Sequence, residues 1–259
     1  MSQNSSNKQS VISRIWFVIG LSLWTVSVFL IVQILVGLAA SGLMAAGVPL
    51  DSVNSAVFNS VAAAIIYIVS LGAVVGVPLW VRHRRTTRSD LGVTRLPSWL
   101  DIILAPAALI VYMIISAAVL YIFSALAPQI DLTQAQDIPF SNLSHQYEYV
   151  LAFLTLVVLA PLAEELLFRG YLFGKMKKHA PFWLAMIITS VLFGGLHLIA
   201  GESLQWNVAA DTFALSLVLC TLRQVTGNIW AGVLLHMIKN GIAYYFLFIN
   251  PSLLHTIGG

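Results

Sequence analysis

Residues 150–178, with the sequence VLAFLTLVVLAPLAEELLFRGYLFGKMKK, combine a long apolar run with a cluster of charges. The run is uncharged up to the pair Glu164-Glu165, which is followed by Arg169. An ionisable group at the centre of a bilayer costs roughly 3 kcal/mol, so a helix that keeps several of them needs a use for them. The stretch therefore predicts a membrane-spanning helix that carries a chemical site.

The composition of the whole chain supports a membrane protein. Of its 259 residues, 59% are hydrophobic and 9% are charged, and the mean hydropathy is +0.90, which excludes an ordinary soluble domain. Because a bilayer core requires about 20 apolar residues per helix, we predict an all-α, polytopic transmembrane helix bundle of about seven spans. The predicted spans are 15–50, 52–81, 102–130, 149–163, 181–200, 207–222 and 229–249. A re-entrant piece within the long first run would make eight.

The basic residues predict how the spans are oriented. All but Lys239 of the 13 Lys and Arg residues lie before the first span or close alternate spans. Because loops rich in Lys and Arg stay on the cytoplasmic side, we predict a cytoplasmic N-terminus and an external C-terminus. The net charge of +3 then reflects membrane topology, and no nucleic-acid partner is expected.

Polar residues in three predicted spans are spaced to meet one another. Glu165 and Arg169 are four residues apart, as are His236 and Asn240, so each pair shares one helix face. Glu164 is rotated by about 100° from Glu165. A buried ion pair accounts for Glu165 and Arg169 but leaves Glu164 without a structural purpose. A lone histidine in an apolar helix is more often a hydrogen-bonded core residue, but two histidines with a spare glutamate favour a reactive site.

Three motifs, in this order and on separate spans, resemble those of a known family. Glu164-Glu165-x-x-x-Arg169, Phe193-x-x-x-His197 and His236-x-x-x-Asn240 resemble the motifs of the CAAX prenyl protease type II and bacteriocin-processing family of intramembrane proteases. The resemblance covers about residues 148–250. We accordingly divide the chain into a polar cytoplasmic segment, three N-terminal spans with an external loop, a motif-bearing protease core and an external tail. These parts are residues 1–14, 15–147, 148–250 and 251–259.

The resemblance implies hydrolysis of a peptide bond, and the residue chemistry permits it. Glu164 can deprotonate a water as general base, with His197 holding that water. His236 and Asn240 can donate hydrogen bonds to the developing oxyanion. Supporting roles fall to Glu165, Arg169 and Phe193.

A zinc ion is the alternative source of the reactive water. Glu164, His197 and His236 are ligand types of a catalytic zinc site with one open position. The compact H-E-x-x-H ligand pair does not occur in the sequence, so the prediction is catalysis without a cofactor.

Two other function classes remain open for the sequence. Intramembrane Glu, Arg, His and Asn residues also line proton or ion pathways in transporters, although paired repeats with broken helices are not found here. A family member could also act without turnover, as a membrane scaffold or immunity factor. The expected partners are membrane lipid and a membrane-associated peptide or protein substrate, and the expected location is a prokaryotic cell membrane.

Overall fold

The chain forms a bundle of membrane-spanning helices. The computed structural model describes residues 2–134, 136–140 and 142–252, and these contain helices and loops but no strand. Six helices are long and apolar enough to cross a membrane, and a seventh, α8, is a shorter apolar helix. The predicted all-α, multi-pass membrane fold is therefore confirmed. Of the predicted tail 251–259, positions 253–259 lie outside the described residues.

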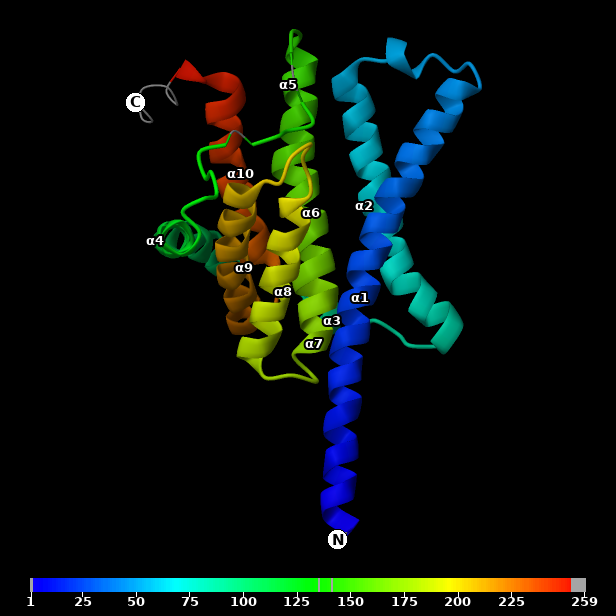
Figure 1. Ribbon diagram of the computed structural model, residues 1–259, viewed down its shortest axis with the longest axis vertical. Coiled ribbons are helices and arrows are strands. Elements are labelled where there is room, and N and C mark those ends of the chain that lie inside the picture. The colour runs from blue at the N-terminus through cyan, green and yellow to red at the C-terminus, as the bar shows by residue number, and fades with distance from the viewer. Residues whose placement is uncertain (1, 135, 141, 253–259) are drawn as a thin grey trace.

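One central span contacts five long helices, which are α1 (Ser2–Ala45), α2 (Ser55–Arg82), α8 (Phe182–Leu198), α9 (Trp206–Thr226) and α10 (Trp230–Tyr244). Helix α4 (Trp99–Leu126) packs against α9 and α10 away from that span (Figure 1). Short elements are η1 (Leu50–Ser52), α3 (Arg88–Leu91) and η4 (Tyr245–Ile249). In Figure 1, α1 and α2 lie on one side of the central span, α8, α9 and α10 lie on the other, and α4 is seen end-on. The long first apolar run, 15–50, is unbroken α-helix as far as Ala45, the end of α1, so this part contains no re-entrant piece.

The central span runs from Gln146 to Met176 and leaves the α-helical register twice. Its successive parts are α5 (Gln146–Phe153), η2 (Leu154–Leu159), α6 (Ala160–Glu164), η3 (Glu165–Leu172) and α7 (Phe173–Met176). Both η2 and η3 are π-helical. Such segments are rare in proteins and are frequent at functional sites.

Proline explains why the first π-helical segment needs an outside partner. In η2, the Ala160 N–H donates to the Thr155 carbonyl, so the same pattern would place the nitrogen of Pro161 opposite the Leu156 carbonyl. Proline has no N–H to donate. The side chain of Asn240 supplies the missing bond, because its Nδ2 donates to the Leu156 carbonyl over 2.9 Å. Helix α10 is thereby fixed to the central span.

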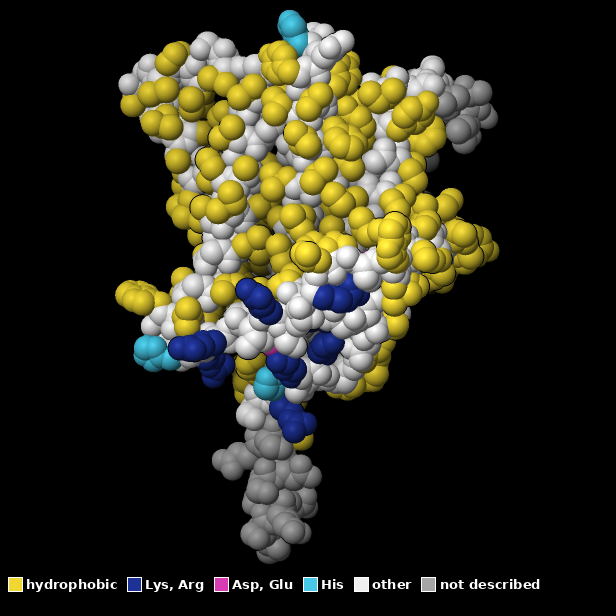
Figure 2. Space-filling model, turned by 180° about the vertical axis from the view of Figure 1, so that it is seen from behind, with side chains coloured by type: hydrophobic (Ala, Val, Ile, Leu, Met, Phe, Trp, Pro, Cys, Tyr) yellow, Lys and Arg dark blue, Asp and Glu magenta, His cyan; other side chains and the backbone are white. Residues whose placement is uncertain are grey.

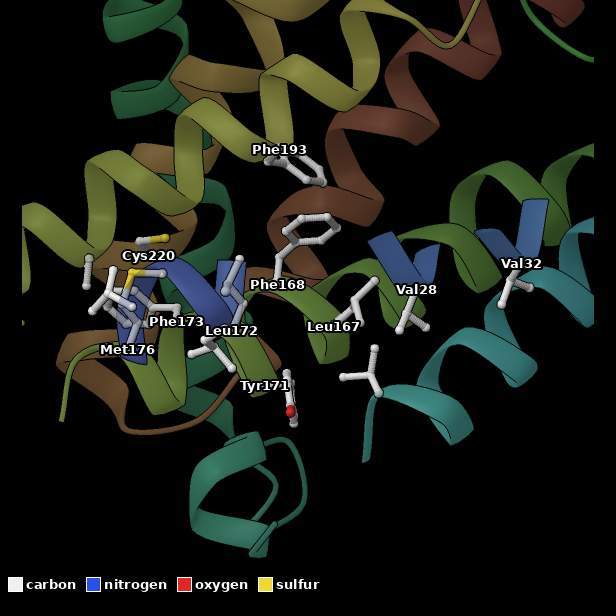
Figure 3. Packing of buried hydrophobic residues seen from close by; sticks show 14 residues of the cluster. Val28, Val32, Leu167, Phe168, Tyr171, Leu172, Phe173, Met176, Phe193 and Cys220 are labelled. Atoms are coloured by element: carbon white, nitrogen blue, oxygen red, sulfur yellow. The ribbon is translucent and has the colours of Figure 1, made fainter. Parts of the chain in front are cut away.

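Apolar packing holds the N-terminal helices against the motif-bearing half. One buried cluster joins residues of α1, α2, η3, α7 and α8, including Val28, Leu167 and Phe168 (Figure 3). The Phe168 and Phe193 rings meet edge to face, with their centroids 5.0 Å apart. Phe193 also contacts Arg169, so the apolar core borders directly on the charged residues of the candidate site.

The basic side chains gather at one end of the described structure (Figure 2). Short helix α3 packs there against α7, because Gly174 has no side chain and a Cβ would overlap the Asp90 carbonyl. Asp90 also forms an ion pair with Lys178. Burial alone would raise the pKa of Asp90, but hydrogen bonds from Lys178 and Thr87 outweigh it and hold the pKa below its usual range. The clustering agrees with a single cytoplasmic face, which remains a prediction.

Labelling of single cysteines will test that orientation. We expect a membrane-impermeant thiol reagent to label Arg85→Cys only from the cytoplasmic side and Gln129→Cys only from outside, because basic loops are retained inside. Both positions are exposed. The native Cys220 is buried and serves as the unlabelled background. Labelling of both positions from the same side would overturn the predicted topology.

Candidate active site

Glu165 and Arg169, which belong to the first motif, form a buried ion pair. Arg169 Nη1 donates to Glu165 Oε1 over 2.9 Å, and both side chains are fully buried. The guanidinium carbon of Arg169 also lies 4.2 Å from the centroid of the Phe193 ring. The pairing predicted from the four-residue spacing is therefore present, and the face of an aromatic ring completes the setting of the cation.

Glu164 has different surroundings from its neighbour. Its Oε1 accepts a hydrogen bond from the Tyr67 hydroxyl of α2 over 2.7 Å. Its Oε2 lies 3.8 Å from His236 Nε2, and 13% of its side chain is exposed. Glu164 ends α6 and Glu165 begins η3, so the change of helical register falls between them. The Glu165 carboxylate is thus paired with the Arg169 cation, while the Glu164 carboxylate remains partly exposed.

His236 lies between the two carboxylates. Its Nδ1 is 3.2 Å from Glu165 Oε1, and its opposite ring nitrogen faces Glu164. The ring is buried against Phe193, with the centroids 6.0 Å apart and the planes almost perpendicular. His236 therefore lies between Glu165, which Arg169 neutralises, and Glu164, which is partly exposed.

His197 is fixed by the backbone of its own helix. Its Nδ1 lies 2.8 Å from the Phe193 carbonyl, which can only accept, so Nδ1 carries the proton. In the neutral ring this leaves Nε2 as a hydrogen-bond acceptor. The centroids of the His197 and Phe193 rings are 4.6 Å apart. Phe193 thus contacts Arg169, His197 and His236.

Asn240 does not join the carboxylates directly. One of its amide hydrogens is used by the Leu156 carbonyl, as described above. The amide group has two N–H donors, so one further donor remains to the side chain. The structure therefore brings Glu164, Glu165, Arg169, Phe193, His197 and His236 into one neighbourhood and places Asn240 at the adjoining π-helical segment.

The three candidate zinc ligands are not arranged as a metal site. Among the residues that the structure describes, no group of three or more His, Cys, Asp or Glu side chains is placed to hold a metal ion. His197 Nδ1 is directed to a carbonyl, and Glu164 Oε1 to a tyrosine. Zinc ligation by Glu164, His197 and His236 would require these side chains to move.

Two features of the site were not predicted from the sequence. Tyr67 lies in a span for which only hydrophobicity was recognised, and a single tyrosine in an apolar helix gives no signal of a partner. Asp211 and Lys239 form an ion pair of 3.3 Å between α9 and α10. Asp211 also accepts hydrogen bonds from Tyr112 and Ser116 of α4. Here a signal existed, since two opposite charges stood alone in neighbouring predicted spans.

Comparison with known proteins covers the same part of the chain. Residues 146–242 match the family model "Type II CAAX prenyl endopeptidase Rce1-like". An Escherichia coli protein named "Uncharacterized 24.3 kDa protein" is 35% identical over 94 residues, which are 35% of this chain and 41% of that protein. A Bacillus subtilis (strain 168) protein named "Putative membrane peptidase YdiL" is 30% identical over 83 residues, which are 32% of each chain.

These matches are local, because the chain spans less than half the length of the curated relatives that it matches. No solved structure matches the chain. The matched segment nevertheless contains all three motifs and every charged residue of the Glu164 neighbourhood. The predicted resemblance is thus confirmed over residues 146–242, where the chain matches the Rce1-like family of type II CAAX prenyl endopeptidases.

Proposed function

We propose that this membrane protein is an endopeptidase that hydrolyses a peptide bond within the bilayer, using a water activated by Glu164. The observation that carries the proposal is the difference between two adjacent glutamates. Glu165 is fully buried and paired with Arg169, whereas Glu164 is partly accessible and is held by Tyr67. A carboxylate that is positioned but not neutralised by a cation is suited to accept a proton from water.

The remaining side chains fit the other steps of hydrolysis. Glu164 takes a proton from water, the resulting hydroxide attacks the carbonyl carbon, and the same proton passes to the leaving amine. We assign His197 Nε2 to holding the water, since Nδ1 is engaged with the Phe193 carbonyl. The second N–H of Asn240 then stabilises the oxyanion, joined by His236 once its Nε2 also carries a proton, because the Nδ1 proton of His236 is directed at Glu165. Arg169 and Glu165 hold His236 in place without touching the substrate. No metal is required in this scheme.

The position of the site within the membrane defines the substrate class. An unpaired backbone amide in lipid is costly, so a scissile bond must enter a polar cavity in an unwound segment. Little helix needs to unwind near a chain end or a flexible junction. The proposed substrate is therefore a membrane-tethered or hydrophobic peptide, such as a prenylated tail or a leader-type peptide.

A peptide-release assay tests the proposal. The purified protein is incubated with a panel of prenylated and leader-type peptides and with a folded soluble protein, alongside Glu164→Ala. Release from a membrane-associated peptide by the wild type alone would support the assignment. A wild type that binds these peptides but releases nothing would favour a scaffold. Efficient digestion of the folded protein, with no membrane-associated peptide cleaved, would indicate a water-facing site.

Removing the Tyr67 hydroxyl should slow the reaction without unfolding the protein. A hydrogen bond to a charged group contributes about 1.5–3 kcal/mol, so we expect Tyr67→Phe to lower kcat roughly ten- to hundredfold with little change in KM. The matched control is Tyr112→Phe, which removes a buried hydroxyl bonded to Asp211 instead. Equal kcat values for the two variants would remove Tyr67 from the reaction.

A further inference from the structure

A cavity of about 640 Å³ lies between α1, α2 and η3 at the basic end of the molecule. Its volume falls within the range of about 300–1,000 Å³ that is usual for small-molecule sites. Its walls are largely apolar. The apolar lining includes Trp16 and Trp24 of α1 and Val77, Pro78 and Val81 of α2. Neither Glu164 nor any other residue of the candidate active site lines it, so this cavity, hereafter the α1–α2 groove, is a separate feature.

The rim of the α1–α2 groove is cationic. Arg82, Arg84 and Lys175 line it, and its lining contains no Asp or Glu. In the described part of the chain, none of these three cations forms an ion pair with a carboxylate, unlike nearby Lys178, which pairs with Asp90. Among the described residues, the carboxylate that acts on Lys175 is Asp90, which already pairs with Lys178, and Arg82 and Arg84 have no carboxylate as an ion-pair partner. A bound ligand with an anionic group would therefore balance the charge of this rim.

The position of the groove indicates what supplies that anion. It lies at the end where the Lys and Arg side chains gather (Figure 2), which is the predicted cytoplasmic side. Anionic lipids are concentrated in that leaflet, and basic pockets between membrane helices on that side bind their head groups. Trp16 is 68% exposed at the rim, in keeping with a tryptophan at the membrane–water interface. The apolar walls suit a hydrocarbon chain.

We propose that the α1–α2 groove binds one anionic phospholipid. Arg82, Arg84 and Lys175 hold its phosphate, and an acyl chain lies along the apolar wall between α1 and α2. Val77 is ten residues from Tyr67 on α2, about 15 Å along the helix. None of the residues that line the groove belongs to the candidate active site, so the bound lipid does not touch the reacting atoms. It joins α1 and α2 to the central span and so stabilises the helix that presents Tyr67 to Glu164.

Lipid binding by the purified full-length protein tests the proposal without reference to its activity. The probes are phosphatidylglycerol and phosphatidylcholine with identical acyl chains, measured as lipid adducts in native mass spectrometry and as shifts in melting temperature. We expect one tightly held phosphatidylglycerol, which raises the melting temperature by several degrees, and no comparable effect of phosphatidylcholine. Equal binding of both lipids would overturn the proposal.

Matched variants separate the groove from the general positive charge of that end. Arg82→Ala, Arg84→Ala and Lys175→Ala together should weaken phosphatidylglycerol binding about a hundredfold. The control combines Arg85→Ala, Arg88→Ala and Lys177→Ala, which removes the same charge outside the groove lining and should retain binding. Equal losses in the two triple variants would mean that only surface charge attracts the lipid, which contradicts a defined site.

A third variant tests the apolar part of the groove at constant charge. Gly20 lines the cavity, and a Cβ built on it meets no heavy atom of another element within 4 Å. Gly20→Trp should therefore fold normally, fill the groove and abolish the melting-temperature shift. Retained lipid binding in this variant, or stoichiometric displacement of the lipid by a hydrophobic substrate peptide, would overturn the assignment of the groove to phospholipid.

Discussion

Glu164→Gln is expected to abolish peptide release while the protein remains folded. Glutamine keeps the size of the side chain and can still bond to Tyr67, but it cannot accept a proton from water. General-base catalysis typically contributes about 10²–10⁴-fold, so kcat should fall by at least about a hundredfold. Single-turnover release of a labelled membrane peptide measures the loss, and an unchanged melting temperature shows that the fold is retained.

Glu148→Gln is the matched control for this experiment. Glu148 is another glutamate of the central span, but it is buried and caps the start of α5 by accepting from the Ser144 and His145 backbone and from Asn54. Its replacement should affect stability and leave kcat close to the wild-type value. Full activity in Glu164→Gln would refute the general-base assignment, and a comparable loss in both variants would point to a general effect on the span.

The sequence predicted those features that depend on local periodicity. Charge-free runs predicted the spans because a bilayer excludes charge, and the spacing of Glu165 and Arg169 predicted their pairing because residues four apart share a helix face. The different surroundings of Glu164 followed from the same geometry. These inferences need no knowledge of which helices are neighbours.

Features that depend on contacts between helices could not be predicted from the sequence. The bond from Tyr67 to Glu164 joins residues 97 positions apart, and nothing in α2 marks that tyrosine among its apolar neighbours. The link between Asn240 and Leu156 depends on a π-helical segment next to Pro161, and helical register is not encoded in hydrophobic periodicity. Asn240 therefore has a structural role in addition to the predicted role of stabilising the oxyanion.

Arg169→Ala is expected to destabilise the protein by about 3–5 kcal/mol, because removing one partner of a buried ion pair leaves the other charge uncompensated. Glu165 is fully buried, and its Oε2 already has no hydrogen-bond partner within the described structure. Within the described structure, His236 would then be the remaining hydrogen-bond partner of Glu165 Oε1, since it shares that oxygen with Arg169. Denaturant unfolding in detergent measures the change.

A double variant distinguishes lost charge balance from lost catalysis. Replacing both members of a buried ion pair by uncharged groups is often neutral, so Glu165→Gln with Arg169→Met should recover most of the stability lost in Arg169→Ala. Its activity should stay low, because His236 loses the carboxylate that orients it. If Arg169→Ala were inactive yet as stable as the wild type, the guanidinium would have to act on the substrate. The ion pair would then belong to the catalytic machinery instead of its support.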